Sequence, residues 1–168
     1  MLRRMFVDPG SISAGWALAE GVQVLCSGTI DANARADASV RMAEIGRKFQ
    51  AQAHELQTLG FNWSESCIER IPNACALETH HAVGVIRAAL SPYSKVRFDP
   101  LLIPSAWQKY CGWEREIMNK KTARITDIRV GHGLKLGSPL APHVPLVMSK
   151  DELAARGLAL FYSSKRKE

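Results

Sequence analysis

The chain has 168 residues, of which 46% are hydrophobic and 23% charged, the proportions of an ordinary globular domain. No apolar run approaches the roughly 20 residues of a membrane span, and the apolar stretch after the basic start is too short for a signal peptide. We therefore expect a cytoplasmic protein with one domain over 1–168 and no membrane partner. The net charge of +6 favours a polyanionic partner without separating DNA from RNA or a membrane surface.

The cysteines do not indicate a metal site. They form no C-x-x-C pair and have no close histidine in a zinc pattern. We expect reduced and mostly buried thiols at all four positions, Cys26, Cys67, Cys75 and Cys111.

The first thirty residues predict three short strands. A basic and apolar segment, 3–7, leads into Asp8-Pro9-Gly10-Ser11, a turn in which proline presets one φ angle and glycine accepts a positive one. A second strand is expected over 12–19. After the tight turn Glu20-Gly21, the alternating segment 22–30 predicts a third. Strands joined by tight turns form an antiparallel meander.

Helices and strands then alternate. Apolar residues at intervals of mostly three or four predict an amphipathic helix over 38–59, ended by Gly60. The following segments predict a buried strand, a second helix, and a strand that continues toward a loop: 66–71, 76–90 and 95–98. Strands followed by strand–helix alternation favour an α/β fold with a mixed sheet.

The last third of the chain predicts more helices. A short one is expected over 105–109 and a basic one over 120–130, followed by an irregular Gly/Pro-rich segment, 131–145. Ser149 is a good N-cap for a last helix over 151–162, with Glu152 at the capping-box position. We expect the tail, 163–168, to be frayed.

Two acidic residues stand where carboxylates are costly. Asp8 ends a strand that should be central, and Glu69 lies within an apolar strand segment. A turn residue before proline would explain Asp8, and an ion pair with Arg70 or a lysine would explain Glu69. Alternatively, the two converge at the ends of neighbouring strands, where a divalent cation would relieve their repulsion. Asp151 is a third candidate ligand, although an acid in a helix's first turn also stabilises the helix dipole.

These segments together resemble the RuvC family of Holliday-junction resolvases, particularly its phage-type members. Phe6-Val7-Asp8-Pro9-Gly10-Ser11 with Ala14-Gly15-Trp16-Ala17 resembles the family's first motif, and Cys67-Ile68-Glu69-Arg70 its second. Residues 81–86, 104–112 and 120–121 are similar to the segments that follow, and 151–159 resembles the terminal Asp-x-x-Asp-Ala helix. The resemblance spans 5–160. It implies an RNase H-like fold, with an antiparallel meander, then parallel strands, in a five-stranded mixed sheet flanked by helices.

The resemblance also implies a site and a reaction. Asp8, Glu69 and Asp151 would be catalytic metal ligands for Mg²⁺, with Mn²⁺ a possible substitute. Lys121 would approach the scissile phosphate, although a solvated helix lysine is the ordinary alternative; Lys109 and Lys120 have less support. The partner would be a branched DNA, the four-way junction, and the protein a homodimer whose two-fold axis matches that of the junction.

One position departs from the family pattern. A fourth acid is expected three residues after Asp151, on the same helix face, and the chain has Ala154 there. An engineered change, a natural loss of cleavage, or substitution by Glu152 would each account for it. Glu152 lies about 200° around the helix axis from Ala154, so direct replacement is poor.

The sequence thus predicts a structure-specific endonuclease that resolves Holliday junctions, in a bacterial or phage-infected cell, with cleavage impaired by Ala154. A non-catalytic junction-binding protein is the alternative, and a nuclease acting on RNA–DNA hybrids stays open because the fold hosts several nucleases. Trp63, Trp107 and Trp113 could stack on unpaired bases or fill the core. For the five histidines, surface or capping roles are expected.

Overall fold

A mixed five-stranded sheet forms the centre of the protein in the computed structural model, which describes residues 2–111, 122–124 and 147–165. The strand order is β3-β2-β1-β4-β5. The antiparallel strands are β1 (Arg3–Asp8), β2 (Ser13–Glu20) and β3 (Gln23–Asp31), and the two parallel to β1 are β4 (Glu65–Ile68) and β5 (Lys95–Arg97). The predicted meander followed by parallel strands is therefore confirmed.

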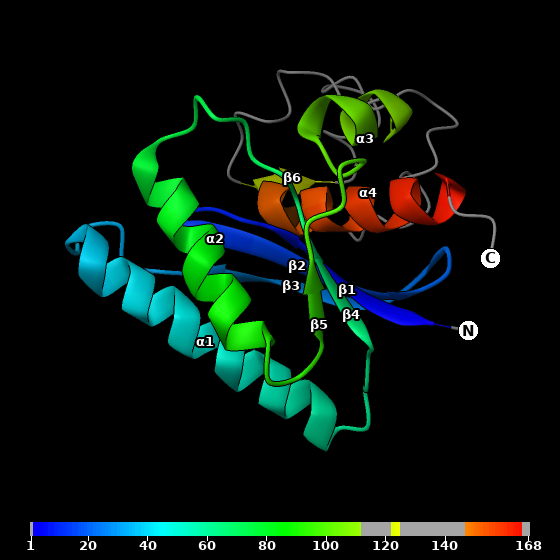
Figure 1. Ribbon diagram of the computed structural model, residues 1–168, viewed down its shortest axis with the longest axis horizontal. Helices are drawn as coiled ribbons and strands as arrows, with labels where there is room; N and C mark the ends of the chain where they lie inside the picture. Colours follow the sequence, from blue (N-terminus) through cyan, green and yellow to red (C-terminus); the bar gives the residue numbers. More distant parts are fainter. Residues whose placement is uncertain (1, 112–121, 125–146, 166–168) are drawn as a thin grey trace.

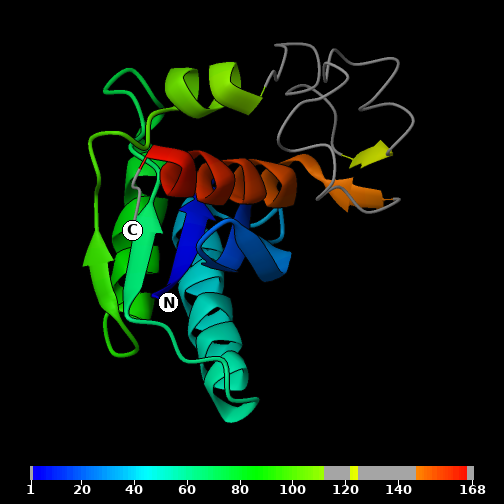
Figure 2. The same cartoon turned by 90° about the vertical axis from the view of Figure 1, so that its right-hand side faces the viewer.

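Helices cover both faces of this sheet (Figures 1 and 2). On one face lie α1 (Ala38–Thr58) and α2 (Leu77–Leu90), which pack against each other. On the other face α4 (Lys150–Lys165) lies across β1, β2 and β3, and α3 (Pro104–Cys111) packs on α4. Among the described residues, no helix has the length and apolar character needed to cross a membrane.

Strand alternation assigns side chains to the two faces. Met5 and Val7 of β1 belong to the apolar cluster under α1 and α2, whereas Phe6 belongs to the cluster under α4. Because successive side chains of a strand point to opposite faces, Asp8 falls on the α4 face with Phe6. In β4, Ile68 belongs to the cluster under α1 and α2, and Cys67 belongs to the cluster under α4. Glu69, two residues after Cys67, therefore also falls on the α4 face.

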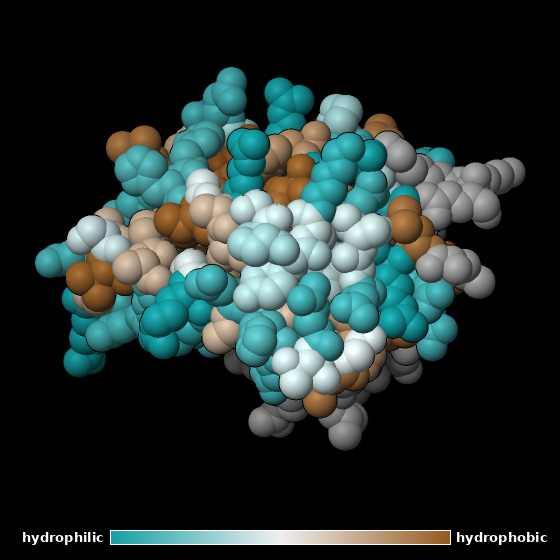
Figure 3. Space-filling view, turned by 60° about the horizontal axis from the view of Figure 1, so that its bottom comes forward, coloured by the Kyte–Doolittle hydropathy of each residue, from teal (hydrophilic) through white to brown (hydrophobic). Residues whose placement is uncertain are grey.

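The α1 and α2 side is an ordinary apolar layer. The buried residues of α1 are spaced by three or four positions: Met42, Ile45, Phe49, Ala53 and Leu56. Val40 and Leu59, which share the predicted period, are 54% and 65% exposed, so the buried stripe is shorter than predicted. Figure 3 looks toward the lower side of Figure 1, and its hydrophobic atoms form small separate groups among hydrophilic ones.

Several predicted boundaries are wrong. The fourth strand ends at Ile68 instead of 71, so Glu69 stands just beyond the strand and not within it. Thr122–Arg124, predicted to be helical, forms a strand, β6, which pairs antiparallel with β7 (Val147–Ser149). This long-range pairing overrides the local helical pattern. The last helix continues to Lys165 through the segment predicted to fray. The rest of the predicted helix and the segment 131–145 lie outside the described residues.

Candidate metal and nuclease site

Asp8 and Glu69 meet at one end of the two central strands. β1 and β4 are parallel with Val7 opposite Ile68, so the next residues along both strands are neighbours. The Glu69 N–H continues this pairing by donating to the Val7 carbonyl oxygen at 2.9 Å. The two side chains emerge on the same face and hydrogen-bond to each other. The predicted convergence of these two carboxyl groups is present.

Burial raises the pKa of both carboxyl groups. For Asp8 the loss of hydration is the largest cause, followed by the negative charge of Glu69 and the hydrogen bond with it. For Glu69 desolvation again raises the pKa, while hydrogen bonds from Asp8 and Trp107 partly oppose the rise. Two carboxyl groups in contact cannot both ionise without cost, so in the absence of a cation they share a proton.

Asp151 joins this pair from the start of α4. Its negative charge also raises the pKa of Asp8. Its own carboxylate accepts a hydrogen bond from Ser13 Oγ at 2.5 Å, and desolvation raises its pKa. Asp151 is thus close enough to Asp8 to affect its pKa but is held toward β2 by Ser13.

Gly15 permits this approach of α4 to the sheet. It pairs with Asp8 across β1 and β2, and a Cβ atom there would lie 1.8 Å from the Asp151 carbonyl oxygen and 2.1 Å from its carbon. Both atoms are backbone and cannot move aside cheaply. A side chain at Gly15 would therefore push Asp151 away from Asp8.

Polar contacts fix the first turn of α4 on the edge strand. Ser149 caps the helix as predicted, since its Oγ accepts the Glu152 N–H at 3.0 Å. The Glu152 carboxylate accepts from Ser27 Oγ at 2.5 Å and lies 3.6 Å from the Arg156 guanidinium. Glu152 is therefore engaged with β3, which argues against its replacing an acid at position 154.

Ala154 is 2% exposed and belongs to the apolar cluster of the α4 face, together with Phe6 and Trp107. The fourth carboxylate that the family resemblance implies would stand at this buried position.

Trp107 is a site residue whose role the sequence did not indicate. Its indole Nε1–H donates to Glu69 Oε1 at 2.5 Å, and the residue is 1% exposed. It is therefore unavailable for stacking on bases. Trp63, 5% exposed, donates to Ser66 Oγ and stacks on Tyr93, so it too belongs to the core. No local sequence signal links Trp107 to Glu69, because the two lie 38 residues apart.

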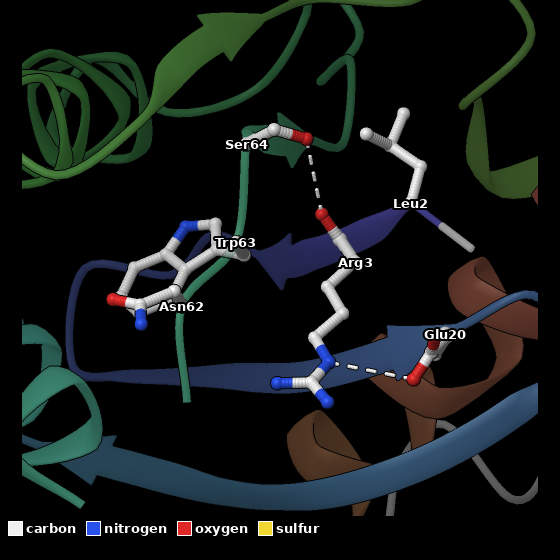
Figure 4. Close-up of a pocket in the computed structure, with 6 residues that line it drawn as sticks. All are labelled: Leu2, Arg3, Glu20, Asn62, Trp63 and Ser64. Atoms are coloured by element: carbon white, nitrogen blue, oxygen red, sulfur yellow. Dashed lines mark hydrogen bonds and ion pairs between the residues drawn. The ribbon is translucent and has the colours of Figure 1, made fainter. Parts of the chain in front are cut away.

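A groove of about 680 Å³ opens beside Asp151. It lies between the turn after β1, the end of β3 and the start of α4, and is lined by Gly10, Ser11, Ile12, Ser13, Asp31, Ala32, Ala34, Ser149, Lys150 and Asp151. A second hollow, of about 470 Å³, lies at the opposite end of β1, where Arg3 Nε is 3.4 Å from Glu20 Oε2 (Figure 4). Of these two hollows, only the first is lined by a candidate ligand, Asp151.

The other predicted site residues are less informative. Lys121, Lys120 and Trp113 lie outside the described residues. Lys109 falls in the last turn of α3.

Of the four free cysteines, Cys67 and Cys111 are buried, and burial raises the pKa of each thiol to about 12. Cys26 and Cys75 are only partly buried, so the prediction of buried thiols holds for two of the four.

The donor set fits a hard divalent cation. Mg²⁺ binds carboxylate oxygens, and a cation would replace the proton that Asp8 and Glu69 share. Within 2–111, 122–124 and 147–165, no three His, Cys, Asp or Glu side chains already surround one point as metal ligands would. Asp151, the third candidate ligand, does not join Asp8 and Glu69 around one point because its carboxylate is hydrogen-bonded to Ser13.

The mixed five-stranded sheet with its flanking helices is a RuvC/RNase H-like fold. Two solved structures share the fold: RuvC of Thermus thermophilus in complex with a Holliday junction substrate, with a TM-score of 0.59 and 15% identity, and T. thermophilus RuvC, with 0.55 and 13%. Each match covers 98% of this chain and 96% of the other. No protein-family model matches the chain, and a search of curated proteins finds no match either.

Proposed function

We propose that the chain is a structure-specific endonuclease that resolves four-way DNA junctions by Mg²⁺-dependent hydrolysis, with one nuclease domain over 1–168. The observation that carries the proposal is the contact between Asp8 and Glu69 at the ends of adjacent central strands. Two buried acids in contact cost stability unless a proton or a cation lies between them, and this cost is characteristic of functional sites. The structural likeness to a RuvC solved with a Holliday junction supports this substrate.

Asp8, Glu69 and Asp151 would hold the metal. Mn²⁺ would be an alternative ion. When bound, the ion would activate water and neutralise charge developing on the phosphate. The protein's part is to hold Asp8 and Glu69 side by side, where a cation would favour the ionised form of both, and to bring the start of α4 near them across Gly15. Asp151 would leave Ser13 to complete the ligand set, and Lys121 would support the phosphate.

The groove beside Asp151 offers a path for a DNA strand. Lys150 and the hydroxyl groups of Ser11 and Ser149 line it and suit phosphate oxygens. The net charge of +6 has the matching sign. Much of the affinity would then come from phosphate contacts, so junction binding should weaken steeply with added salt. A homodimer would place two such sites symmetrically on a four-way junction.

Cleavage would be impaired in this chain because Ala154 occupies the place of the fourth carboxylate. The same observation favours a second candidate, a junction-binding protein that does not cleave. Both candidates predict tight junction binding, and they differ in what a carboxylate at position 154 would do.

The test is cleavage of a labelled four-way junction with Mg²⁺ and then Mn²⁺, comparing the chain with its Ala154→Asp variant. We expect cleavage by the variant and little or none by the unmodified chain. Ala154→Asn, equal in size and uncharged, is the matched control and should not cleave. Asp8→Asn introduced with Ala154→Asp should abolish the gain.

If Ala154→Asp folds, binds the junction and cannot cleave it with either ion, the non-catalytic candidate is favoured. An excess of unlabelled RNA–DNA hybrid tests the substrate. Stronger competition by the hybrid than by an unlabelled junction would contradict junction specificity.

A further inference from the structure

Two side chains hydrogen-bond to the Glu69 carboxylate, the neighbouring acid Asp8 and the indole of Trp107. The Nε1 to Oε1 distance is 2.5 Å, and the residues are 1% and 5% exposed, so this hydrogen bond is shielded from water. An indole N–H only donates, so it favours an ionised acceptor and cannot itself bind a cation. Trp107 therefore orients Glu69 without competing for a metal.

The position of Trp107 depends in turn on a glycine of α4. A Cβ atom at Gly157 would lie 2.8 Å and 2.9 Å from Cε3 and Cζ3 of the indole, closer than carbon atoms pack. Gly157 thus leaves the space in which the ring lies between α3 and α4. A methyl group there would displace the ring and, with it, the N–H that reaches Glu69.

These contacts connect α4 to both sides of the carboxyl site. The helix supplies Asp151 directly, and through Gly157 and Trp107 it also sets the orientation of Glu69, just beyond β4. A helix that shifted along the sheet would move two candidate metal ligands together.

We propose that Trp107 is a positioning residue that fixes Glu69 for metal binding, and that Gly157 is required for its placement. The inference rests on the proposed function, since it takes Glu69 to be a metal ligand. Loss of such an outer hydrogen bond to a metal ligand lowers metal affinity roughly 10- to 100-fold. Neither residue touches the reacting phosphate.

The experiment is Mn²⁺ binding to the unmodified chain, measured by the electron paramagnetic resonance signal of the free ion. Trp107→Phe keeps most of the ring and removes the N–H, and we expect its Mn²⁺ dissociation constant to rise about tenfold. Gly157→Ala should raise it in the same direction without changing either hydrogen-bonding residue. Should Trp107→Phe fail to fold, Gly157→Ala becomes the decisive variant.

Trp63→Phe is the matched control. It removes another buried indole N–H, whose acceptor is Ser66 Oγ at 3.0 Å, on the α1 and α2 face. This substitution should lower the free energy of unfolding and leave Mn²⁺ affinity unchanged. A general loss of packing would instead affect both variants alike.

Two results would overturn the inference, and they differ in what else they imply. If Trp107→Phe and Gly157→Ala bind Mn²⁺ as tightly as the unmodified chain, Trp107 is structural and the proposed function stands. If the unmodified chain binds no Mn²⁺ even with junction DNA present, both the positioning role and the proposed metal site are wrong.

Discussion

The two faces of the central sheet are built differently. The face toward α1 and α2 is an apolar layer, to which Ile45, Phe49 and Ile86 contribute fully buried side chains. The face toward α4 is also buried but contains charged groups: Glu65 lies between Arg4 and Arg97 at 2.9 Å and 2.8 Å, and Glu69 accepts from Trp107. One face therefore contributes mainly stability, and the other accommodates buried charged groups at some cost in stability.

The largest expected effect is a cavity in the α1 and α2 face. Phe49 is 1% exposed at the middle of the buried stripe of α1, so Phe49→Ala should lower the free energy of unfolding by about 4 kcal/mol. Urea denaturation followed by circular dichroism measures it. Val40→Ala, at a position 54% exposed on the same helix, should change stability by less than about 0.5 kcal/mol. Equal losses in the two variants would contradict this assignment of the core.

The second largest effect is expected from a carboxylate introduced on the α4 face. Ala154→Asp buries an acid among apolar side chains, and we expect it to lower the free energy of unfolding by about 2 kcal/mol without metal. Mg²⁺ should recover much of this loss if the new carboxylate is a ligand. Denaturation of the variant and of Ala154→Asn, each with EDTA and with Mg²⁺, measures the recovery. Equal recovery in both variants would show that position 154 does not contact the ion.

A third effect comes from the thiols of the α4 face. Burial raises the pKa of Cys67 from 9.0 to about 12, so the unfolded thiol ionises at a pH at which the folded one stays protonated. The folded state keeps its full stability below about pH 9 and loses it as the pH rises toward 12. At about pH 10 the loss should be roughly 1.4 kcal/mol for this thiol.

Unfolding measured at about pH 8 and pH 10 tests this, and the quantity to compare is the change between the two pH values. The change should be smaller in Cys67→Ala, whatever that substitution does to absolute stability. An identical change in Cys67→Ala and the unmodified chain would contradict the burial of this thiol.

The outline of this architecture could be predicted from the sequence because its signals are local. Turn residues at Asp8-Pro9-Gly10-Ser11 and the three- and four-residue spacing on α1 define elements without reference to the rest of the chain. Thr122–Arg124 was predicted to be helical and forms a strand because its partner, Val147–Ser149, lies more than twenty residues away. Pairings of that kind leave no local pattern.

The site divides in the same way. Asp8 and Glu69 could be predicted because each is an acid in or beside an apolar strand. The Trp107 hydrogen bond and the close approach at Gly15 could not, because both depend on how α3 and α4 pack against the sheet. Whether Asp8, Glu69 and Asp151 bind a metal stays a prediction, as does the role of Lys121.

The smallest expected effect is the free energy of unfolding that the protein loses by burying the two acids Asp8 and Glu69 in contact. Because burial and Glu69 raise the pKa of Asp8, this pair opposes folding least below the unfolded values near 3.8 and 4.5 when no metal is bound. The folded state loses stability as the pH rises above them, since the unfolded carboxyl groups ionise first. Asp8→Asn removes one of the two acids and should raise stability at neutral pH by about 1 kcal/mol in EDTA.

Thermal unfolding measured from about pH 4 to pH 7 in EDTA tests this. The melting temperature of the unmodified chain should fall over this range, and that of the variant should change less. With Mg²⁺ the order should reverse, because only the unmodified chain would retain the full ligand set. If Asp8→Asn is instead less stable than the unmodified chain in EDTA, Asp8 serves the turn after β1, and the α4 face is no more costly to fold than the other.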